Sequence, residues 1–331
     1  MTEPLPRLAI VIPTIGRYEE LRRLLASLAA QTRLPDEILI LDEDQSSRVF
    51  GSQFPQLKIR VAAAPGSASF KRNAGFKAVR PGVGLVGFMD DDIVLQPQAI
   101  ENLLGFWQTA EDGLGGTGCN WVNAPPPFAR RLKSLRLTSR LGLYRSDAGA
   151  VLPSGFQTLM TYFAQSTYVQ WLPSGAAVYS RRVLEEFAFD EWFEGYSYLE
   201  DLDFSYRVGK KYKLAVVAGA RFYHHPSPVG RPNWYLFGKK EVLNRLHFVA
   251  KHRELSRALC CLALLIRALM SALLGFRKVE SGYFKRLAGN FTGAILAVVG
   301  GAGAPAPAPS ASCNHPMTSS FASSGLHEEC R

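Results

Sequence analysis

The chain has 331 residues, 47% of them hydrophobic, which is enough to bury a sizeable core, and a formal charge of +10. The basic excess is concentrated in residues 130–145 and 239–286, and the second zone borders apolar segments rather than interleaved aromatic residues. This distribution argues against nucleic acid as a partner and favours an anionic membrane surface. Five scattered cysteines without CxxC spacing predict a reduced, cytoplasmic chain.

The first ninety residues alternate strand and helix patterns. We expect strand, helix, strand, helix and strand at residues 7–13, 18–32, 36–44, 69–79 and 82–92. This alternation predicts an α/β domain with a mainly parallel sheet. Ligands of such sheets bind beyond the carboxyl ends of the strands, which is where Thr14, Asp42 and the triplet Asp90 to Asp92 fall.

After Pro97 the pattern is less regular. The predicted elements are a loop with a basic helix, a strand followed by a turn and a short helix, a longer helix, and a strand, at residues 124–145, 167–187, 197–211 and 212–226. Ser197 and Glu200 have the spacing of a capping box, which predicts that the helix starts at Ser197. From Trp234 onward the chain reads as helical and basic.

The triplet "DDD" at 90–92 follows the apolar run "VGLVGFM". Adjacent carboxylates repel one another, but a divalent cation among them offsets that repulsion, and aspartate oxygens suit Mg²⁺ or Mn²⁺. Asp90 and Asp92 are two residues apart and point the same way in extended backbone. The triplet therefore predicts a metal and phosphate site, with a solvated turn as the alternative.

An ordered set of motifs resembles the family 2 glycosyltransferases, which have the nucleotide-sugar-binding GT-A fold. The matching segments are "IVIPTIGR" (10–17), "EILILDEDQSS" (37–47), "KRNAGFKAV" (71–79), "FMDDDI" (88–93), "SGAAVYSRRVLEEF" (174–187), "YLEDLDFSYRV" (198–208) and "FYHHPSP" (222–228). They span residues 8 to about 250. One departure is "DEDQSS", where the family usually has two acids followed by glycine and serine.

The resemblance implies a role for each matched residue. Residues expected to bind the nucleotide sugar are Thr14, Arg17, Asp42, Arg72, Asp90 and Asp91. Those expected to hold Mg²⁺ or Mn²⁺ are Asp90, Asp92 and His224, although the sequence does not separate His224 from His225. Of the acidic pair Glu200 and Asp201, Asp201 would be the general base, and Asn73 would help to hold the start of its helix.

Other interpretations of the same residues remain open. Glu200 is equally explained as the partner of Ser197 in a capping box, Arg72 as a surface arginine, and Asp42 as a turn former. Asp203 is expected to be a solvated helix acid. Trp171 and Trp192 fit either an acceptor groove or the core.

The implied reaction is inverting and metal-dependent. A sugar would move from a nucleoside diphosphate donor, of UDP or dTDP type, to a hydroxyl of a cell-surface polysaccharide or a lipid-linked glycan. The alternatives are a sugar nucleotidyltransferase and an inactive glycan- or nucleotide-binding protein. The first usually has a Gly-rich, basic loop after its first strand, and "PTIGRYEE" has a single glycine.

Two apolar segments follow the matched region. Residues 258–276 would form a helix of about 28 Å, close to the hydrocarbon thickness, but Arg267 lies at its centre. Residues 287–303 carry Gly289 and Gly293, a spacing that favours close helix packing. We expect interfacial or hairpin-like attachment at the inner face of the cell membrane, with packing on the soluble domain as the alternative.

These observations divide the chain into three parts. We expect a GT-A catalytic domain at 1–250, a helical, membrane-associated segment at 251–303, and a disordered low-complexity tail at 304–331.

Overall fold

The computed structural model describes residues 5–124, 145, 147–230 and 232–300. The strands are β1 (Leu8–Pro13), β2 (Glu37–Leu41), β3 (Ile59–Ala62), β4 (Leu85–Met89), β5 (Ile93–Leu95), β6 (Leu114–Trp121), β7 (Thr167–Val169), β8 (Ala176–Ser180) and β9 (Lys213–His224). The helices are α1 (Tyr18–Ala29), η1 (Ser46–Val49), α2 (Phe50–Gln53), α3 (Ala68–Ala78), α4 (Ala99–Thr109), α7 (Arg181–Glu186), α8 (Glu200–Gly209), α9 (Trp234–Lys251), α10 (Arg257–Lys278) and α11 (Ser281–Val299).

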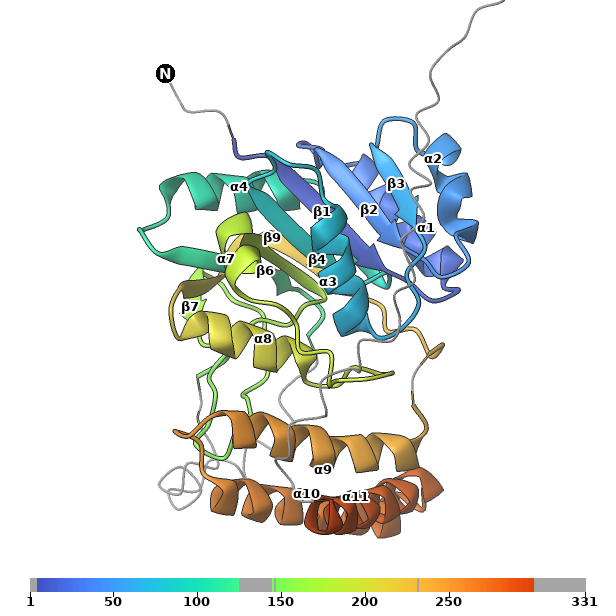
Figure 1. Cartoon of the computed structure of the whole chain (residues 1–331), viewed down its shortest axis with the longest axis vertical. Helices are drawn as coiled ribbons and strands as arrows, with labels where there is room; N and C mark the ends of the chain where they lie inside the picture. The colour runs from blue at the N-terminus through green and yellow to red at the C-terminus, as the bar shows by residue number, and fades with distance from the viewer. Residues whose placement is uncertain (1–4, 125–144, 146, 231, 301–331) are drawn as a thin grey trace, which may run out of the picture.

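The strands form one mixed sheet in the order β3-β2-β1-β4-β8-β6-β9-β5, with β7 paired to β9 (Figure 1). Strands β3, β2, β1 and β4 are parallel, so their carboxyl ends lie along one edge. Strand β8 runs antiparallel to both β4 and β6, and β6 is parallel to β9. The mainly parallel half of the sheet is the α/β arrangement expected from the sequence.

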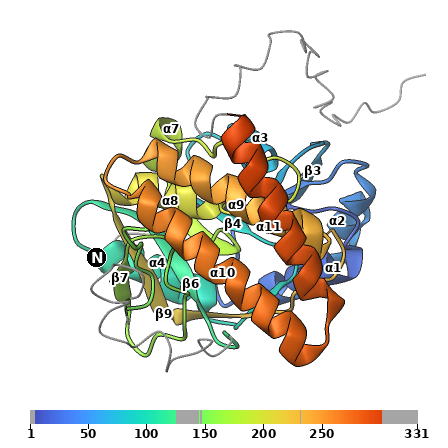
Figure 2. The ribbon, with the colours of Figure 1, turned by 90° about the horizontal axis from the view of Figure 1, so that it is seen from below.

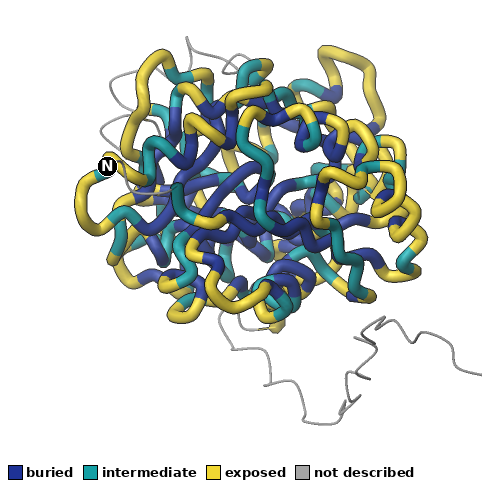
Figure 3. The backbone as a smooth tube through the Cα atoms, turned by 90° about the horizontal axis from the view of Figure 1, so that it is seen from above, coloured by how far each residue is buried: buried dark blue, intermediate teal, exposed yellow. Residues whose placement is uncertain are grey.

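Both faces of the parallel half are buried (Figure 3). In β1, Leu8, Ile10 and Ile12 pack in a cluster with α1 and α4, whereas Ala9 and Val11 pack in a second cluster with side chains of α7 and α8. This double burial explains why the strand reads as a continuous apolar run rather than an alternating one.

The five elements expected in the first ninety residues are confirmed: four are shorter than expected, and the helix expected at 69–79 lies at 68–78. Strand β3 and the short helices η1 and α2 were not expected. The third expected strand stops at Met89, so all three aspartates lie beyond it. The helix expected from residue 197 begins at Glu200 instead. The basic helix expected within 124–145 and the tail at 304–331 lie outside the described residues, apart from residues 124 and 145.

Helix α11 packs unusually closely on α9 (Figure 1). A Cβ added at Gly289 would lie 2.0 Å from the carbonyl oxygen of Tyr235, and one at Gly293 would lie 2.8 Å from that of Lys239. From the other side, a Cβ at Gly238 would lie 2.1 Å from the carbonyl oxygen of Arg286. The close packing expected from the Gly289 and Gly293 spacing is confirmed, and its partner is α9.

A buried carboxylate joins the three C-terminal helices. Glu241 of α9 accepts from Arg267 Nε of α10 at 2.7 Å and from Nη2 of Arg286 of α11 at 2.7 and 2.9 Å. Asn290 also donates to it, at 3.2 Å. Burial raises the pKa of Glu241, but the two arginines outweigh it and hold the pKa below its ordinary value, so the group is charged. Arg267, the charge inside the apolar segment, therefore has a protein partner.

Candidate active site

The aspartate triplet lies in the turn after β4, and its central carboxylate is held inside the protein. Thr14, at the end of β1, donates its hydroxyl to Asp91 Oδ2 at 2.7 Å, and Arg17 Nη1 donates to Oδ1 at 3.0 Å. Burial raises the pKa of Asp91 to about 7, against the lowering effect of Arg17 and Thr14. Thr14, Arg17 and Asp91 therefore form one polar cluster joining the ends of β1 and β4.

Asp92 points towards the end of β9. Its Oδ1 lies 3.0 Å from His224 Nε2, and its Oδ2 accepts from the Ser227 backbone N–H at 3.1 Å. Burial raises the pKa of Asp92, but His224 and Ser227 bring it below the ordinary value. His225 contacts the same aspartate through its backbone N–H, which donates to the Asp92 carbonyl. The structure thus separates the two histidines: the His224 ring contacts the Asp92 carboxylate, whereas His225 contacts Asp92 through its backbone.

Asp90 is linked to the acidic pair of α8 by Arg72 of α3. Arg72 is 3% exposed; its Nη2 donates to Asp90 Oδ1 at 3.0 Å and its Nη1 to Glu200 Oε1 at 2.8 Å. Gly175 leaves room beside Asp90, since a Cβ there would lie 3.1 Å from Asp90 Oδ2. Arg72 is therefore a buried bridge between residues 110 positions apart, rather than a surface arginine.

The acidic pair begins α8 directly after a strained residue. Leu199 is buried with φ of +78°, a conformation that non-glycine residues rarely adopt and that costs of order 1–3 kcal/mol. The expected capping box is wrong: Ser197 Oγ donates to the Phe193 carbonyl at 2.8 Å, and Glu200 bonds Arg72 instead. Burial and the neighbouring Asp201 raise the pKa of Glu200, against Arg72.

Asp201 is oriented by the backbone around it. Its Oδ1 accepts from the Leu202 N–H at 2.7 Å, and the Ser174 N–H also lowers its pKa. Burial outweighs these contacts and Arg72, so the pKa of Asp201 lies above its ordinary value. Ser205 fixes the same turn, donating to the Asp201 carbonyl at 2.6 Å. The carboxylate is thus held in place and made more basic.

Asp42, after β2, has a structural contact of its own. It is 2% exposed, and its Oδ2 accepts from the Ser47 N–H at 3.0 Å, which fixes the start of η1. Lys71, which was not among the expected site residues, is 1% exposed and donates to the Thr14 carbonyl at 2.7 Å. Burial lowers the pKa of Lys71, against nearby Glu43 and Asp42. The sequence feature that could have identified Lys71 is its position as the first residue of the matched segment "KRNAGFKAV".

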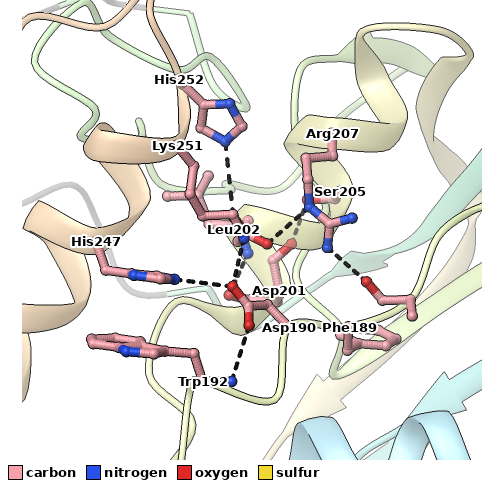
Figure 4. A network of polar contacts seen from close by, with 12 residues as sticks. Phe189, Asp190, Trp192, Asp201, Leu202, Ser205, Arg207, His247, Lys251 and His252 are labelled. Atoms are coloured by element: carbon pink, nitrogen blue, oxygen red, sulfur yellow. Dashed lines mark hydrogen bonds and ion pairs between the residues drawn. The ribbon is translucent and has the colours of Figure 1, made fainter. Parts of the chain in front are cut away.

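A polar network joins α8 to the end of α9 (Figure 4). Asp203 is fully buried, so the expectation that it is solvated was wrong. Its carboxylate lies 3.0 Å from Arg207 Nε, 2.7 Å from Lys251 Nζ and 3.8 Å from His252 Nε2. Asp203 therefore anchors α8, the helix that carries Asp201.

The same lysine reaches the loop before α8. Lys251 Nζ lies 2.6 Å from Asp190 Oδ2, which also lies 3.0 Å from His247 Nε2 (Figure 4). Trp192 stacks on the His247 ring with centroids 3.8 Å apart. Asn73, expected to hold its own helix start, instead donates to the Phe189 carbonyl of this loop at 2.9 Å. Trp171 is in the core.

The described residues contain no group of three or more His, Cys, Asp or Glu side chains arranged to hold a metal ion. The types of ligand atom nevertheless fit a divalent metal ion. Asp92 and His224 are already in contact, and the side chain of Asp90 is 37% exposed. Carboxylate oxygens with one imidazole suit Mn²⁺ or Mg²⁺.

A polar site of this kind at the carboxyl edge of a half-parallel sheet is that of a GT-A glycosyltransferase. The glycosyl transferase family 2 model matches residues 9–187, and the chain belongs to that family. It is therefore a transferase enzyme, which confirms the expected fold class and enzyme class.

Comparison with individual proteins agrees with this assignment. An uncharacterized glycosyltransferase of Haemophilus influenzae is 35% identical over 100 residues, which are 29% of this chain and a third of that protein. The mannosyltransferase PcManGT of Pyrobaculum calidifontis, solved with GDP-Man and Mn²⁺, has a TM-score of 0.53 at 13% identity, covering 88% of each chain. GalNAc-T7, solved with UDP, GalNAc and Mn²⁺, has a TM-score of 0.55 at 14% identity, covering 75% of this chain and 48% of that one.

Proposed function

We propose that this enzyme transfers a sugar, with inversion, from a nucleoside diphosphate donor of UDP or dTDP type to a glycan hydroxyl. The observation that carries the proposal is the Arg72 bridge. It brings Asp90, from the strand edge where ligands bind, to the Glu200–Asp201 pair, so that acids for the donor and for the acceptor share one site.

Asp201 is proposed as the general base. In the reaction, the acceptor oxygen forms a bond to the anomeric carbon and loses its proton to the carboxylate. The bond to the diphosphate breaks, and the electron pair leaves with it. A raised pKa suits this role, because a base works best when its pKa approaches the working pH.

The donor would lie along the ends of β1, β2 and β4. Thr14, Arg17, Asp42, Arg72 and Asp91 would contact the nucleotide sugar, and Asp90, Asp92 and His224 would hold Mg²⁺ or Mn²⁺. Such a cation would neutralise the negative charge that develops on the departing diphosphate. Two solved proteins of similar fold, one with GDP-Man and Mn²⁺ and one with UDP, GalNAc and Mn²⁺, support a nucleoside diphosphate donor and a divalent cation, and the second supports a donor of UDP type.

The acceptor is proposed to be a cell-surface polysaccharide or a lipid-linked glycan, reached from the cytoplasmic side of the cell membrane. Support comes from the C-terminal helices. By length and composition, α10 is the one described helix that is apolar enough to cross a membrane.

Ligand binding tests the donor class. UDP, dTDP, GDP and the corresponding sugars are screened by thermal shift with Mn²⁺, Mg²⁺ or EDTA. A ligand at 100 Kd raises the unfolding free energy by about 2.7 kcal/mol, which is readily seen. We expect a response to UDP or dTDP that depends on the cation. No response to any nucleoside diphosphate contradicts the proposal.

Turnover tests the base. Asp201→Asn should keep donor binding and lower the release of nucleoside diphosphate by about 10²–10⁴-fold. Glu185→Gln, an exposed acid on α7, is the control and should have normal turnover. If Asp201→Asn is active and Glu200→Gln is not, the base is misassigned by one residue. Release of pyrophosphate from a nucleoside triphosphate and a sugar phosphate would instead identify a nucleotidyltransferase.

A further inference from the structure

The outer faces of α10 and α11 are unusually apolar. Of 24 exposed large hydrophobic side chains among the described residues, 13 lie between residues 257 and 299. On α10 they are Leu262, Leu265, Ile266, Leu269, Leu273 and Phe276. An exposed apolar surface of this extent on a soluble protein marks an interaction site.

These side chains form a continuous stripe opposite the packed side of the helix. Cys260, Ser271 and Gly275 are buried on the inner side of α10, whereas Leu269 and Leu273 are 57% and 68% exposed. On α11, Gly289 and Gly293 face α9, while Ile295 is 62% exposed. Figure 2 shows both helices lying across the same end of the molecule, in front of α9.

The contacts of Glu241 argue against α10 crossing a membrane. For α10 to cross a membrane, it would have to separate from α9, taking Arg267 into the hydrocarbon and removing a partner from the buried Glu241. Helix α11, which follows α10 directly, is held on α9 by its own close contacts with backbone at Gly238 and Gly289. The helices are therefore built to stay on the protein and to present their outer faces.

Basic side chains without an acidic partner flank the apolar stripe. Arg257 begins α10, Arg277 and Lys278 end it, and Lys285 follows in α11; all four are exposed. In the described part of the chain, none of them forms an ion pair with a carboxylate. Basic side chains at the edge of an apolar surface complement anionic lipid headgroups.

We propose that α10 and α11 lie in the plane of a membrane that contains anionic lipids. Their apolar side chains enter the acyl-chain boundary, and the four basic residues lie at the headgroups. The proposal goes beyond the transfer reaction and does not depend on it, since binding to vesicles is measured without donor or acceptor.

Vesicle flotation of the full chain tests the partner. Binding should be strong to phosphatidylcholine vesicles containing phosphatidylglycerol and much weaker to phosphatidylcholine alone. The double variant Arg277→Glu, Lys278→Glu should lose about 25-fold or more in affinity, because each basic side chain near the surface contributes about fivefold. Lys58→Glu, an exposed lysine on the sheet body, is the control and should bind normally.

The apolar contribution is tested in the same assay. Leu269→Asp with Leu273→Asp should lower binding by at least about tenfold. Val49→Asp, which changes a side chain 51% exposed in η1, should have no effect. A full chain that binds neither vesicle overturns the proposal, and so does a dimer in solution that the double aspartate variant dissociates. Equal binding to both vesicles contradicts the anionic partner.

The depth of α10 in the bilayer distinguishes a helix that lies in the membrane plane from one that spans the membrane. Tryptophan is placed at Leu262, Leu269 or Phe276, which lie along about 21 Å of the stripe, and its quenching by brominated lipids is measured relative to the unmodified chain. In-plane helices give similar, shallow depths at all three positions. A markedly deeper position for Leu269 indicates a spanning helix and refutes the proposal.

Discussion

Gly289→Ala tests the packing of α11 on α9. The added methyl carbon would lie 2.0 Å from the Tyr235 carbonyl oxygen and 2.9 Å from the Lys239 backbone nitrogen. Carbon and oxygen atoms normally stay about 3.3 Å apart or more, so the helices must separate by more than about 1 Å. Backbone atoms cannot rotate away as a side chain can, and the contacts of Glu241 and Asn290 across the same interface would be strained.

The magnitude follows from two opposing effects. Overpacking costs about 1–3 kcal/mol, and a backbone contact belongs at the upper end of that range. Alanine in place of a helical glycine stabilises by about 1 kcal/mol. We therefore expect a net loss of about 2 kcal/mol. Gly105→Ala in α4 is the matched control, since nothing lies within 4 Å of its Cβ; it should stabilise by about 0.5–1 kcal/mol.

The assay is urea denaturation followed by far-UV circular dichroism, with the two variants compared at an unchanged m-value. The midpoint should fall for Gly289→Ala and rise for Gly105→Ala. If both variants raise the midpoint by similar amounts, α11 does not pack on α9 in solution. The arrangement of the three C-terminal helices would then be wrong.

Three further predictions concern the sites. Asp92→Ala, or EDTA added to the unmodified enzyme, should abolish transfer and weaken diphosphate binding; undiminished transfer in EDTA would remove the cation from the reaction. Lys251→Met should lower the free energy of unfolding by about 1–3 kcal/mol, because the hydrogen bond that Lys251 donates to Asp190 and its ion pair with Asp203 are lost. In the same denaturation assay, Lys58→Met should change the free energy of unfolding by less than about 0.5 kcal/mol. Burial raises the pKa of Asp190, but hydrogen bonds from His247 and Lys251 outweigh burial and hold the pKa well below its ordinary value. The contribution of Asp190 to the free energy of unfolding is therefore complete above about pH 4, the pKa of the unfolded chain, and is lost as the pH falls below that. The stability difference between the unmodified chain and Asp190→Asn, measured from pH 7 downward, should therefore shrink only below about pH 4, and a difference that shrinks at higher pH would contradict this.

Local pattern was enough to predict five elements of the first ninety residues, but not β3, α4 or β6. The strand at 7–13 and the helix at 18–32 have periodicities that hold without tertiary context, and the triplet at Asp90 is placed by the end of the strand before it. The pattern failed where long-range contacts decide. The spacing of Ser197 and Glu200 fits a capping box, but Arg72, 128 residues away from Glu200, provides a stronger partner.

Long-range contacts also explain why the burial of Asp203 in α8 was not predicted. Asp203 looks like any helix acid, and its burial depends on Lys251 and His252, whose positions no local signal encodes. Likewise, Leu199 gives no hint of its positive φ, because that conformation is imposed by the packing around it. Neighbouring histidines such as His224 and His225 can be separated only once the register of β9 with β5 is known.

The Asp203–Lys251 contact also sets where this enzyme can be recombined with its relatives. A chimera that joins residues 1–250 to foreign C-terminal helices would replace Lys251 and His252, leaving a fully buried carboxylate with Arg207 alone. A junction after residue 252 keeps that contact but still separates Glu241 from Arg267 and Arg286. The helices α9, α10 and α11 are therefore best exchanged as one cassette, and the recipient should carry an α8 and a 187–197 loop from the same donor.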